Sequence, residues 1–324
     1  MLGEFLPKGV AISIFLAGHN GMVGQSMFQH AKKYGQTLLT AERDELDLRN
    51  SADVLEYFQT YKPSSVILAA AKVGGIYANL SHKKDFLVDN LKIQNAVILS
   101  ALESNVKKLI FLGSSCIYPK NTSQPIREDS LLTGPLESTN EAYALAKISG
   151  VKLCEYIREE YGLNYFSLMP TNLYGPGDNF DLENSHVPAA LLRKFHVAKI
   201  NNLPFVKVWG TGTPMREFMH VDDLSDAIWF THQNPPSENL VNVGTGSDIS
   251  ITEFASKVAD VVGYRGDIEF DSSMPDGTPR KLLDSSKISA MGWHPQIELS
   301  DGLVSTYKWF IESIELGAVR GYTK

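Results

Sequence analysis

The first half of the chain alternates between short apolar runs and longer segments with the spacing of amphipathic helices. The apolar runs are typical of strands buried on both faces of a parallel sheet, and they lie at 10–17, 37–40, 65–71, 107–112 and 165–169. The intervening segments predict helices at 25–34, 51–61, 86–104 and 141–161. This repeated alternation predicts an α/β fold with a doubly wound parallel sheet of the Rossmann type.

The alternation breaks after residue 178, where loops lengthen. We expect a smaller α/β substrate-binding region built from about 178–220 and 248–316. The stretch from about 221 to 247 returns to the pattern of the first half, because Asp222 and Asp223 open a helix and residues 240–244 predict a further strand. The predicted Rossmann domain therefore comprises 10–177 plus about 221–247, and the absence of linker-like sequence predicts one compact unit.

A glycine-rich loop separates the first predicted strand from the first predicted helix. Its sequence is Gly18-His19-Asn20-Gly21-Met22-Val23-Gly24. Glycines at this spacing permit a tight turn, a close approach of the backbone to a pyrophosphate, and close packing of helix on strand. The helix N-terminus would also face the anion. The loop therefore predicts dinucleotide binding.

The end of the second predicted strand carries both an acidic and a basic side chain, Glu42 and Arg43. In this fold that position meets the adenosine ribose, where an acid favours NAD and an arginine favours the 2′-phosphate of NADP. We predict NADP(H), bound by Arg43. The alternative is that Arg43 pairs with Asp44 or Asp47 on the surface.

Tyr143 and Lys147 lie four residues apart on a predicted helix and therefore share one face. An ammonium group beside a phenol stabilises the phenolate and lowers its pKa, so the pair is suited to exchange a proton with an alcohol or a carbonyl. Ser114 ends the fourth predicted strand, at the edge of the sheet where ligands bind. Its hydroxyl can donate a hydrogen bond to a substrate oxygen beside Tyr143.

The composition narrows the classes of function. The chain has 324 residues, a net charge of -7 and a pI near 5.6, which argue against nucleic-acid binding. Its two cysteines, Cys116 and Cys154, form no zinc or disulfide pattern and suggest a reducing compartment, with no metal site. We interpret residues 1–10 as a short leader without an export signal, and the apolar run 10–17 is too short to span a bilayer. A cytoplasmic enzyme is expected.

Together, the glycine loop, Ser114 and the Tyr143/Lys147 pair resemble the extended short-chain dehydrogenase/reductase superfamily. Further segments resemble the branch of that superfamily that converts GDP-4-keto-6-deoxy-D-mannose to GDP-L-fucose: 70–79, 113–120, 169–176, 209–218 and 275–284. The resemblance covers about residues 13–312. It implies a bifunctional enzyme that epimerises C3 and C5 of the sugar and then reduces the C4 ketone with NADPH.

The resemblance also implies roles for individual residues. Cys116 would be the base of the epimerisation and His186 the acid, while Ser114 and Tyr143 polarise the ketone and Lys147 holds the nicotinamide ribose. The GDP-sugar would be bound by Lys194, Trp209, Arg216 and Asp276, with Arg280 and Lys281 as further candidates. Asp276 has an alternative interpretation as a turn residue in Pro-Asp-Gly.

Other positions are expected around the cofactor because they lie at strand ends or in matching motifs. Besides the glycine loop, Arg43, Ser114, Tyr143, Lys147 and His186, they are Ala70, Ala71, Asn90, Leu112, Gly113, Ser115, Pro170, Thr171, Asn172 and Leu173. Relatives with this resemblance are generally homodimers, with the helix that carries Tyr143 in the interface. Two alternatives remain open: another nucleotide-sugar 4-reductase or 4-epimerase of the same fold, and a non-catalytic NADP-sensing regulator.

Overall fold

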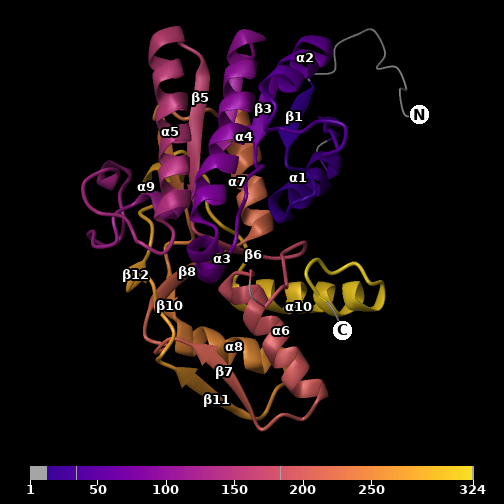
Figure 1. Cartoon of the computed structure of the whole chain (residues 1–324), viewed down its shortest axis with the longest axis vertical. Coiled ribbons are helices and arrows are strands. Elements are labelled where there is room, and N and C mark those ends of the chain that lie inside the picture. The colour runs from indigo at the N-terminus through magenta and orange to yellow at the C-terminus, as the bar shows by residue number, and fades with distance from the viewer. Residues whose placement is uncertain (1–12, 34, 183, 323–324) are drawn as a thin grey trace.

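A six-stranded parallel sheet forms the centre of the larger lobe of the molecule, with helices on both faces (Figure 1). The computed structural model describes residues 13–33, 35–182 and 184–322, so the predicted leader and the first part of the predicted strand at 10–17 lie outside the described residues. The strand order is β2-β1-β3-β4-β5-β9. The strands are β1 (Ile14–Ala17), β2 (Leu38–Leu39), β3 (Ser65–Leu68), β4 (Lys108–Leu112), β5 (Asn164–Pro170) and β9 (Leu240–Val243). The predicted doubly wound parallel sheet is confirmed.

Successive residues of these strands point to opposite faces, and each face buries its own core. Phe15, Val66 and Leu109 pack in one apolar cluster, whereas their neighbours Ile14 and Ile67 pack in the other. The helices of the first face are α2 (Ser51–Tyr61), α4 (Lys83–Glu103) and α5 (Glu141–Tyr161). Those of the second face are α1 (Met22–Lys33) and α7 (Val221–Gln233). Burial on both faces explains why the strand sequences are apolar without alternation.

The smaller lobe has a separate core in which Phe195, Phe254 and Phe310 are fully buried. Its helices are α6 (Val187–Ile200), α8 (Ile251–Val262) and α10 (Leu299–Glu315), around the parallel pair β7 (Phe205–Trp209) and β11 (Asp267–Asp271). A small sheet lies near the junction of the lobes and contains β6 (Asn172–Tyr174), β8 (Met215–His220), β10 (Asp248–Ser250) and β12 (Arg280–Lys281). The remaining elements are α3 (Ile76–Ser81), α9 (Ser286–Ala290) and the 3-10 turns Ser115–Ile117 and Glu128–Ser130.

The division of the chain between the two lobes differs in one segment from the predicted one. Ile288 and Trp293 lie within the stretch 248–316, yet both pack in the core of the large sheet. The indole Nε1 of Trp293 donates a hydrogen bond to Asp226 of α7 at 2.9 Å. Part of the predicted substrate region therefore covers the sheet, because its two large apolar side chains find their partners there.

The order in which the chain adds strands to the sheet reverses at β1, which lies between β2 and β3. The chain leaves β1 for one neighbour, returns past it to the other, and so opens a crevice at the carboxyl ends of β1 and β3. In open α/β sheets, ligands bind at such a switch point. Among the described residues, no helix is long and apolar enough to cross a membrane.

Candidate active site

The loop after β1 is packed too tightly for side chains at two of its glycines. A Cβ at Gly24 would lie 2.2 Å from the Gly18 carbonyl oxygen, and one at Gly18 would lie 2.7 Å from the Ala70 amide nitrogen. Gly18 also has a φ of +93°, in the region that disfavours other residues. The loop therefore runs against the end of β3 and leads directly into α1 at Met22, which presents backbone N–H groups to a bound phosphate.

The acidic and basic residues after β2 have separate surroundings. Glu42 accepts hydrogen bonds from Asn20 at 2.7 Å and pairs with His19 at 3.0 Å, and these bonds lower the pKa of its carboxyl. Arg43 is exposed, and Asp47 pairs with Arg49 at 2.6 Å instead of with Arg43. The charge of Arg43 acts on Asp47, as in the alternative interpretation, but Arg43 forms no ion pair with it among the described residues.

Ser114 and Tyr143 meet at the end of β4. Ser114 begins a 3-10 turn, and its Oγ accepts a hydrogen bond from the Cys116 amide at 3.3 Å. Burial raises the pKa of Tyr143 above its ordinary value, and the neighbouring Cys116 adds to the rise, while a hydrogen bond with Ser114 opposes it. We expected a lowered pKa because of Lys147, and this expectation is wrong for the phenol in this environment. A buried phenol remains protonated and can act as a proton donor.

Lys147 follows Tyr143 by one turn of α5 and is 4% exposed. Its Nζ donates a hydrogen bond to the Leu112 carbonyl at 2.7 Å and lies 4.7 Å from the centre of the Phe111 ring. The distance from Nζ to the centre of the Tyr143 ring is 5.8 Å. Burial lowers the pKa of Lys147 to about 7, so this side chain titrates near neutral pH and is not a fixed cation.

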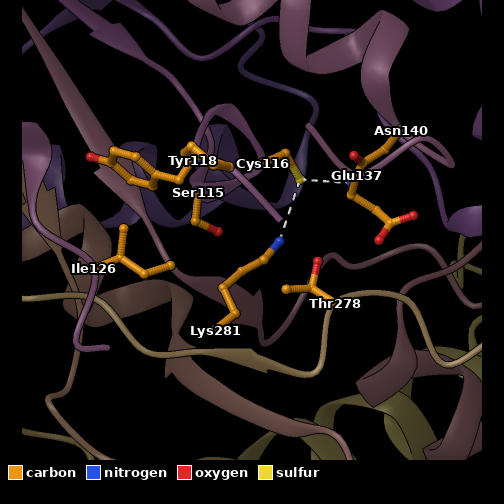
Figure 2. Close-up of a pocket in the computed structure, with 9 residues that line it drawn as sticks. Ser115, Cys116, Tyr118, Ile126, Glu137, Asn140, Thr278 and Lys281 are labelled. Atoms are coloured by element: carbon orange, nitrogen blue, oxygen red, sulfur yellow. Dashed lines mark hydrogen bonds between the residues drawn. The ribbon is translucent and has the colours of Figure 1, made fainter. Parts of the chain in front are cut away.

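Cys116 lies in a pocket beside Ser114, lined by residues from distant parts of the chain (Figure 2). Its Sγ lies 3.2 Å from Asn140 Nδ2 and 3.7 Å from Lys281 Nζ. Figure 2 shows Glu137 and Thr278 on the same side of the pocket. The predicted residues Ser114, Cys116, Tyr143 and Lys147 therefore form one cluster at the carboxyl end of β4.

His186 comes from the smaller lobe, immediately before α6. The residues before it pack on the loop after β3, since the Gly75 amide donates to the Asn184 carbonyl at 3.0 Å. A Cβ on Gly75 would lie 2.6 Å from the Ser185 carbonyl oxygen. His186 is exposed, and no hydrogen bond links it to Cys116 within the described ranges. Its charge interacts with the buried carboxyl of Asp178. Burial raises the pKa of Asp178, and the interaction with His186 opposes the rise.

Several other positions predicted around the cofactor shape the crevice through internal contacts. Asn90 is buried, and its amide accepts from the Lys72 N–H at 2.8 Å and donates to the Lys72 and Phe86 carbonyls. Thr171 and Asn172 donate to the backbone carbonyl of Glu217. The rest lie at the carboxyl ends of β3, β4 and β5 or just beyond them: Ala71, Leu112, Gly113, Ser115, Pro170 and Leu173.

The predicted GDP-sugar residues fall into two pairs. Lys194 donates to the Lys207 carbonyl at 3.0 Å and lies 5.3 Å from the ring of Trp209, which is 44% exposed. Arg216 donates to the Asp276 carbonyl at 3.1 Å, and burial lowers its pKa. The Asp276 carboxylate accepts from the amide and hydroxyl of Thr211 at 2.7 and 2.9 Å. The alternative interpretation of Asp276 as a turn residue thus agrees with its geometry.

Sequence reasoning missed two features of the site. Asn140 precedes α5, where an asparagine normally caps the helix, yet it makes no capping hydrogen bond and contacts Cys116 instead. Lys281 was a candidate for GDP-sugar binding but lies beside the thiol, whereas its neighbour Arg280 pairs with Asp248 at 2.6 Å. The sequence Ser-Thr-Asn before α5 marks Asn140 as a residue at a helix start. No local sequence pattern indicates that Lys281 lies beside Cys116.

Comparisons with known proteins agree with this arrangement. Residues 14–244 match the NAD dependent epimerase/dehydratase family. The chain is 54% identical over 303 residues to "Probable GDP-L-fucose synthase 1" of Oryza sativa subsp. japonica. The alignment covers 93% of this chain and 92% of the relative.

Two solved structures are also similar. A GDP-6-OMe-4-keto-L-xylo-heptose reductase from C. jejuni has a TM-score of 0.88 and 38% identity, over 93% of this chain and 98% of that one. A GDP-L-fucose synthetase from Naegleria fowleri bound to NADP has a TM-score of 0.83 and 28% identity, over 94% and 95%. The chain therefore belongs to the NAD dependent epimerase/dehydratase family, in the branch that contains the GDP-L-fucose synthases.

Proposed function

We propose that this protein converts GDP-4-keto-6-deoxy-D-mannose to GDP-L-fucose, by epimerisation at C3 and C5 followed by NADPH-dependent reduction at C4. The observation that carries the proposal is the cluster of Ser114, Cys116 and Tyr143 at the end of β4. The buried phenol of Tyr143 is hydrogen-bonded with Ser114 and is near enough to Cys116 for their charges to interact, so a proton donor and a thiol lie together there. The names of its relatives at 50–54% identity support the substrate.

The cofactor fits the crevice at the switch point of the sheet. The close packing at Gly18 and Gly24 brings the loop backbone to the end of β3, in position for a pyrophosphate, and Arg43 is available for a 2′-phosphate. The bound NADPH supplies the hydride that reduces the C4 ketone. Lys147 would hold the nicotinamide ribose from its buried position below Tyr143.

The epimerisation requires a base on one face of the sugar and an acid on the other. Cys116 removes the proton from a carbon next to the ketone, and the electron pair of the C–H bond moves to the ketone oxygen. Ser114 and Tyr143 donate hydrogen bonds to that oxygen as its negative charge develops. His186, which comes from the opposite lobe, returns a proton to the other face of the carbon.

The reduction uses the same oxygen site. As C4 becomes tetrahedral, Tyr143 transfers its proton to the oxygen, and the raised pKa of the buried phenol keeps that proton in place until then. Arg216 would bind the diphosphate of the substrate as a guanidinium fork, with Lys194 and Trp209 farther along the nucleotide. Asp276 would then contribute by holding the turn at Thr211 and the backbone that Arg216 contacts.

A second candidate function is reduction at C4 without epimerisation. It is favoured by the structural similarity to a GDP-heptose reductase from C. jejuni. The contacts of Cys116 with Asn140 and Lys281 argue for the bifunctional reaction, because a simple reductase has no use for a thiol held beside the ketone site.

Incubation of the purified enzyme with GDP-4-keto-6-deoxy-D-mannose and NADPH in D2O tests the proposal. We expect NADPH oxidation and a GDP-L-fucose product that carries deuterium at C3 and C5, measured by NMR. Cys116→Ser should abolish the deuterium incorporation while NADPH still binds. Tyr143→Phe should lose about 10²–10⁴-fold in NADPH oxidation and less in deuterium exchange. An unepimerised product, or no NADPH oxidation, would contradict the proposed function.

We also propose that the enzyme acts as a homodimer in the cytoplasm. The helices α4 and α5 pack against each other and carry exposed apolar side chains, namely Val88 and Leu99 on α4 and Leu145 and Tyr156 on α5. The two residues on each helix are about three turns apart and therefore lie on one side of it, and exposed apolar side chains placed in this way are typical of a subunit interface. The thiols of Cys116 and Cys154 are free, which suits a reducing compartment. The small-molecule GDP-sugar is the proposed partner, and the net charge of -7 disfavours nucleic acid.

A further inference from the structure

The sulfur of Cys116 is contacted by two donors that come from distant parts of the chain. Asn140 Nδ2 lies 3.2 Å away and is supplied by the segment that leads into α5. Lys281 Nζ lies 3.7 Å away and is supplied by β12. Both contacts are drawn in Figure 2, where the two side chains approach the sulfur from different sides. A thiolate accepts hydrogen bonds from both, whereas a neutral thiol gains little from an ammonium neighbour.

Lys281 is held firmly in this position. It is 9% exposed, and β12 pairs in register with β8, so that Lys281 lies opposite Arg216. Two residues later, the Leu283 amide donates to the buried carboxylate of Glu217 at 3.0 Å. No carboxylate forms an ion pair with Lys281 in the part of the chain that the structure describes. The negative group nearest to its ammonium is therefore the sulfur, when that sulfur is ionised.

Asn140 does not cap helix α5 and contacts the sulfur of Cys116 instead. An asparagine before a helix normally accepts a hydrogen bond from the first turn, which stabilises the helix by about 1 kcal/mol. Here Asn140 makes no such bond, and its Oδ1 is buried without a hydrogen-bond partner among the described residues. Its amide nitrogen points at Cys116 instead. The side chain is therefore oriented for the thiol and not for the helix.

Three further charged or titratable groups lie around Cys116. Arg216 of β8 is near enough for its charge to interact with that of Cys116. Tyr143 of α5 is neutral because burial raises its pKa. Glu137 also lines the pocket, but its carboxylate is paired with Lys120 at 2.9 Å. Two cations, Lys281 and Arg216, are thus close to the sulfur, and the carboxylate of Glu137 has a cation of its own.

We propose that Lys281, assisted by Asn140, keeps Cys116 as a thiolate aimed at the sugar, and that both are positioning residues for the base of the epimerisation. The inference rests on the proposed function. In the step, the thiolate takes the proton from C3 or C5 and becomes a thiol, the C–H electron pair moves to the C4 oxygen, and Lys281 keeps its own proton throughout. Exchange with solvent then restores the thiolate.

Alkylation of the substrate-free enzyme tests the charge pairing directly. Iodoacetamide labelling between pH 5 and 10, resolved by peptide mass spectrometry, distinguishes Cys116 from the buried Cys154. In Lys281→Met the inflection of Cys116 labelling should move to higher pH by about one unit or more, because an opposite charge at this distance has gone. Lys281→Arg should keep the wild-type inflection, and Asn140→Ala should give a smaller shift in the same direction. The exposed Lys308 on α10 provides the control Lys308→Met, with no shift expected.

Deuterium exchange at C3 and C5 provides the second measurement. At pH 7 Lys281→Met should exchange at least about tenfold more slowly than wild type, and the loss should disappear at high pH, where the thiol ionises unaided. An unchanged labelling profile in Lys281→Met would overturn the inference, as would a slower exchange that no pH restores. If the profile shifts but wild-type enzyme exchanges no deuterium, the charge pairing stands and the proposed function fails.

Discussion

Burial shifts the pKa values of two groups at the centre of the site in opposite directions. Burial raises the pKa of Tyr143 and lowers that of Lys147 to about 7. Each shift disfavours the charged form, as expected in a region from which water is excluded. The phenol is thus a stable donor, while the ammonium becomes easier to deprotonate.

Arg43 permits a prediction about cofactor choice. Arg43→Ala removes a charged partner of a 2′-phosphate, a loss of about 1.5–3 kcal/mol, so the KM for NADPH should rise at least about tenfold while that for NADH changes little. Steady-state kinetics with both cofactors measures this. Arg49→Ala is the matched control, because Arg49 is also exposed but pairs with Asp47. Equal effects of Arg43→Ala on NADPH and NADH would contradict the assignment.

The residues of the site were predictable to the extent that their signals are local. Tyr143 and Lys147 are one helical turn apart, and Ser114 lies just after an apolar strand. These local patterns are enough to predict all three as site residues. Lys281 is separated from Cys116 by 165 positions. That contact depends on the pairing of a two-residue strand with β8, and no local pattern reports it. The direction of the Tyr143 pKa was likewise missed because it depends on burial.

At the scale of elements, the large lobe was predicted well and the small one was not. Helix α5 has the predicted bounds, since its periodic apolar face ends at Gly162 with a φ of +65°. The helices α6, α8 and α10 follow no regular alternation with strands and were not predicted. A signal for α8 was present, because Ser250 and Glu253 form a capping box. The short strands β6, β10 and β12 exist only through pairing with β8.

The loop between β6 and α6 carries a buried carboxylate with a testable effect of pH. Burial raises the pKa of Asp178, so its ionisation opposes folding, and the native state loses stability as pH rises through the raised value. Asp178→Asn cannot ionise. The free energy of unfolding of the variant should therefore increase relative to wild type as pH rises from about 4, the ordinary pKa of an aspartate, and should level off above the raised pKa, measured by urea denaturation.

The control for this experiment is Asp260→Asn on α8, where the wild-type carboxylate is 76% exposed. Its stability difference from wild type should stay nearly constant over the same range, because water already hydrates the charge. A constant difference for Asp178→Asn as well would show that the Asp178 charge is not penalised in the native state.

At the scale of the whole molecule, the two lobes divide the chemistry between them. The larger lobe supplies Ser114 and Cys116 after β4 and Tyr143 from α5, while His186 comes from the residue before α6 and Arg216 from β8. Lys281 and its neighbours connect the two, because β12 pairs with β8 while Leu283 forms a bridge with Ile126. The substrate would therefore lie at the junction, in contact with both lobes.

The apolar face of α4 and α5 gives a prediction about assembly. Leu145→Arg should convert a dimer into a monomer, because it places a charge among these apolar side chains, where Leu145 is 44% exposed. Sedimentation velocity measures the change. Val304→Arg on α10, at a residue 55% exposed in the smaller lobe, should leave the dimer intact. A monomeric wild-type protein would contradict the proposed homodimer.

The position of β9 in the sheet affects the order in which the chain can fold. β9 pairs with β5, yet it follows α6, β7 and β8 of the smaller lobe in the sequence. A nascent chain emerges from its N-terminus, so β5 remains an open edge until residues 240–243 have been synthesised. An unpaired edge strand of this kind can bind other chains. Aggregation during synthesis should therefore be most severe for chains interrupted between β5 and β9, the interval in which a chaperone has most to protect.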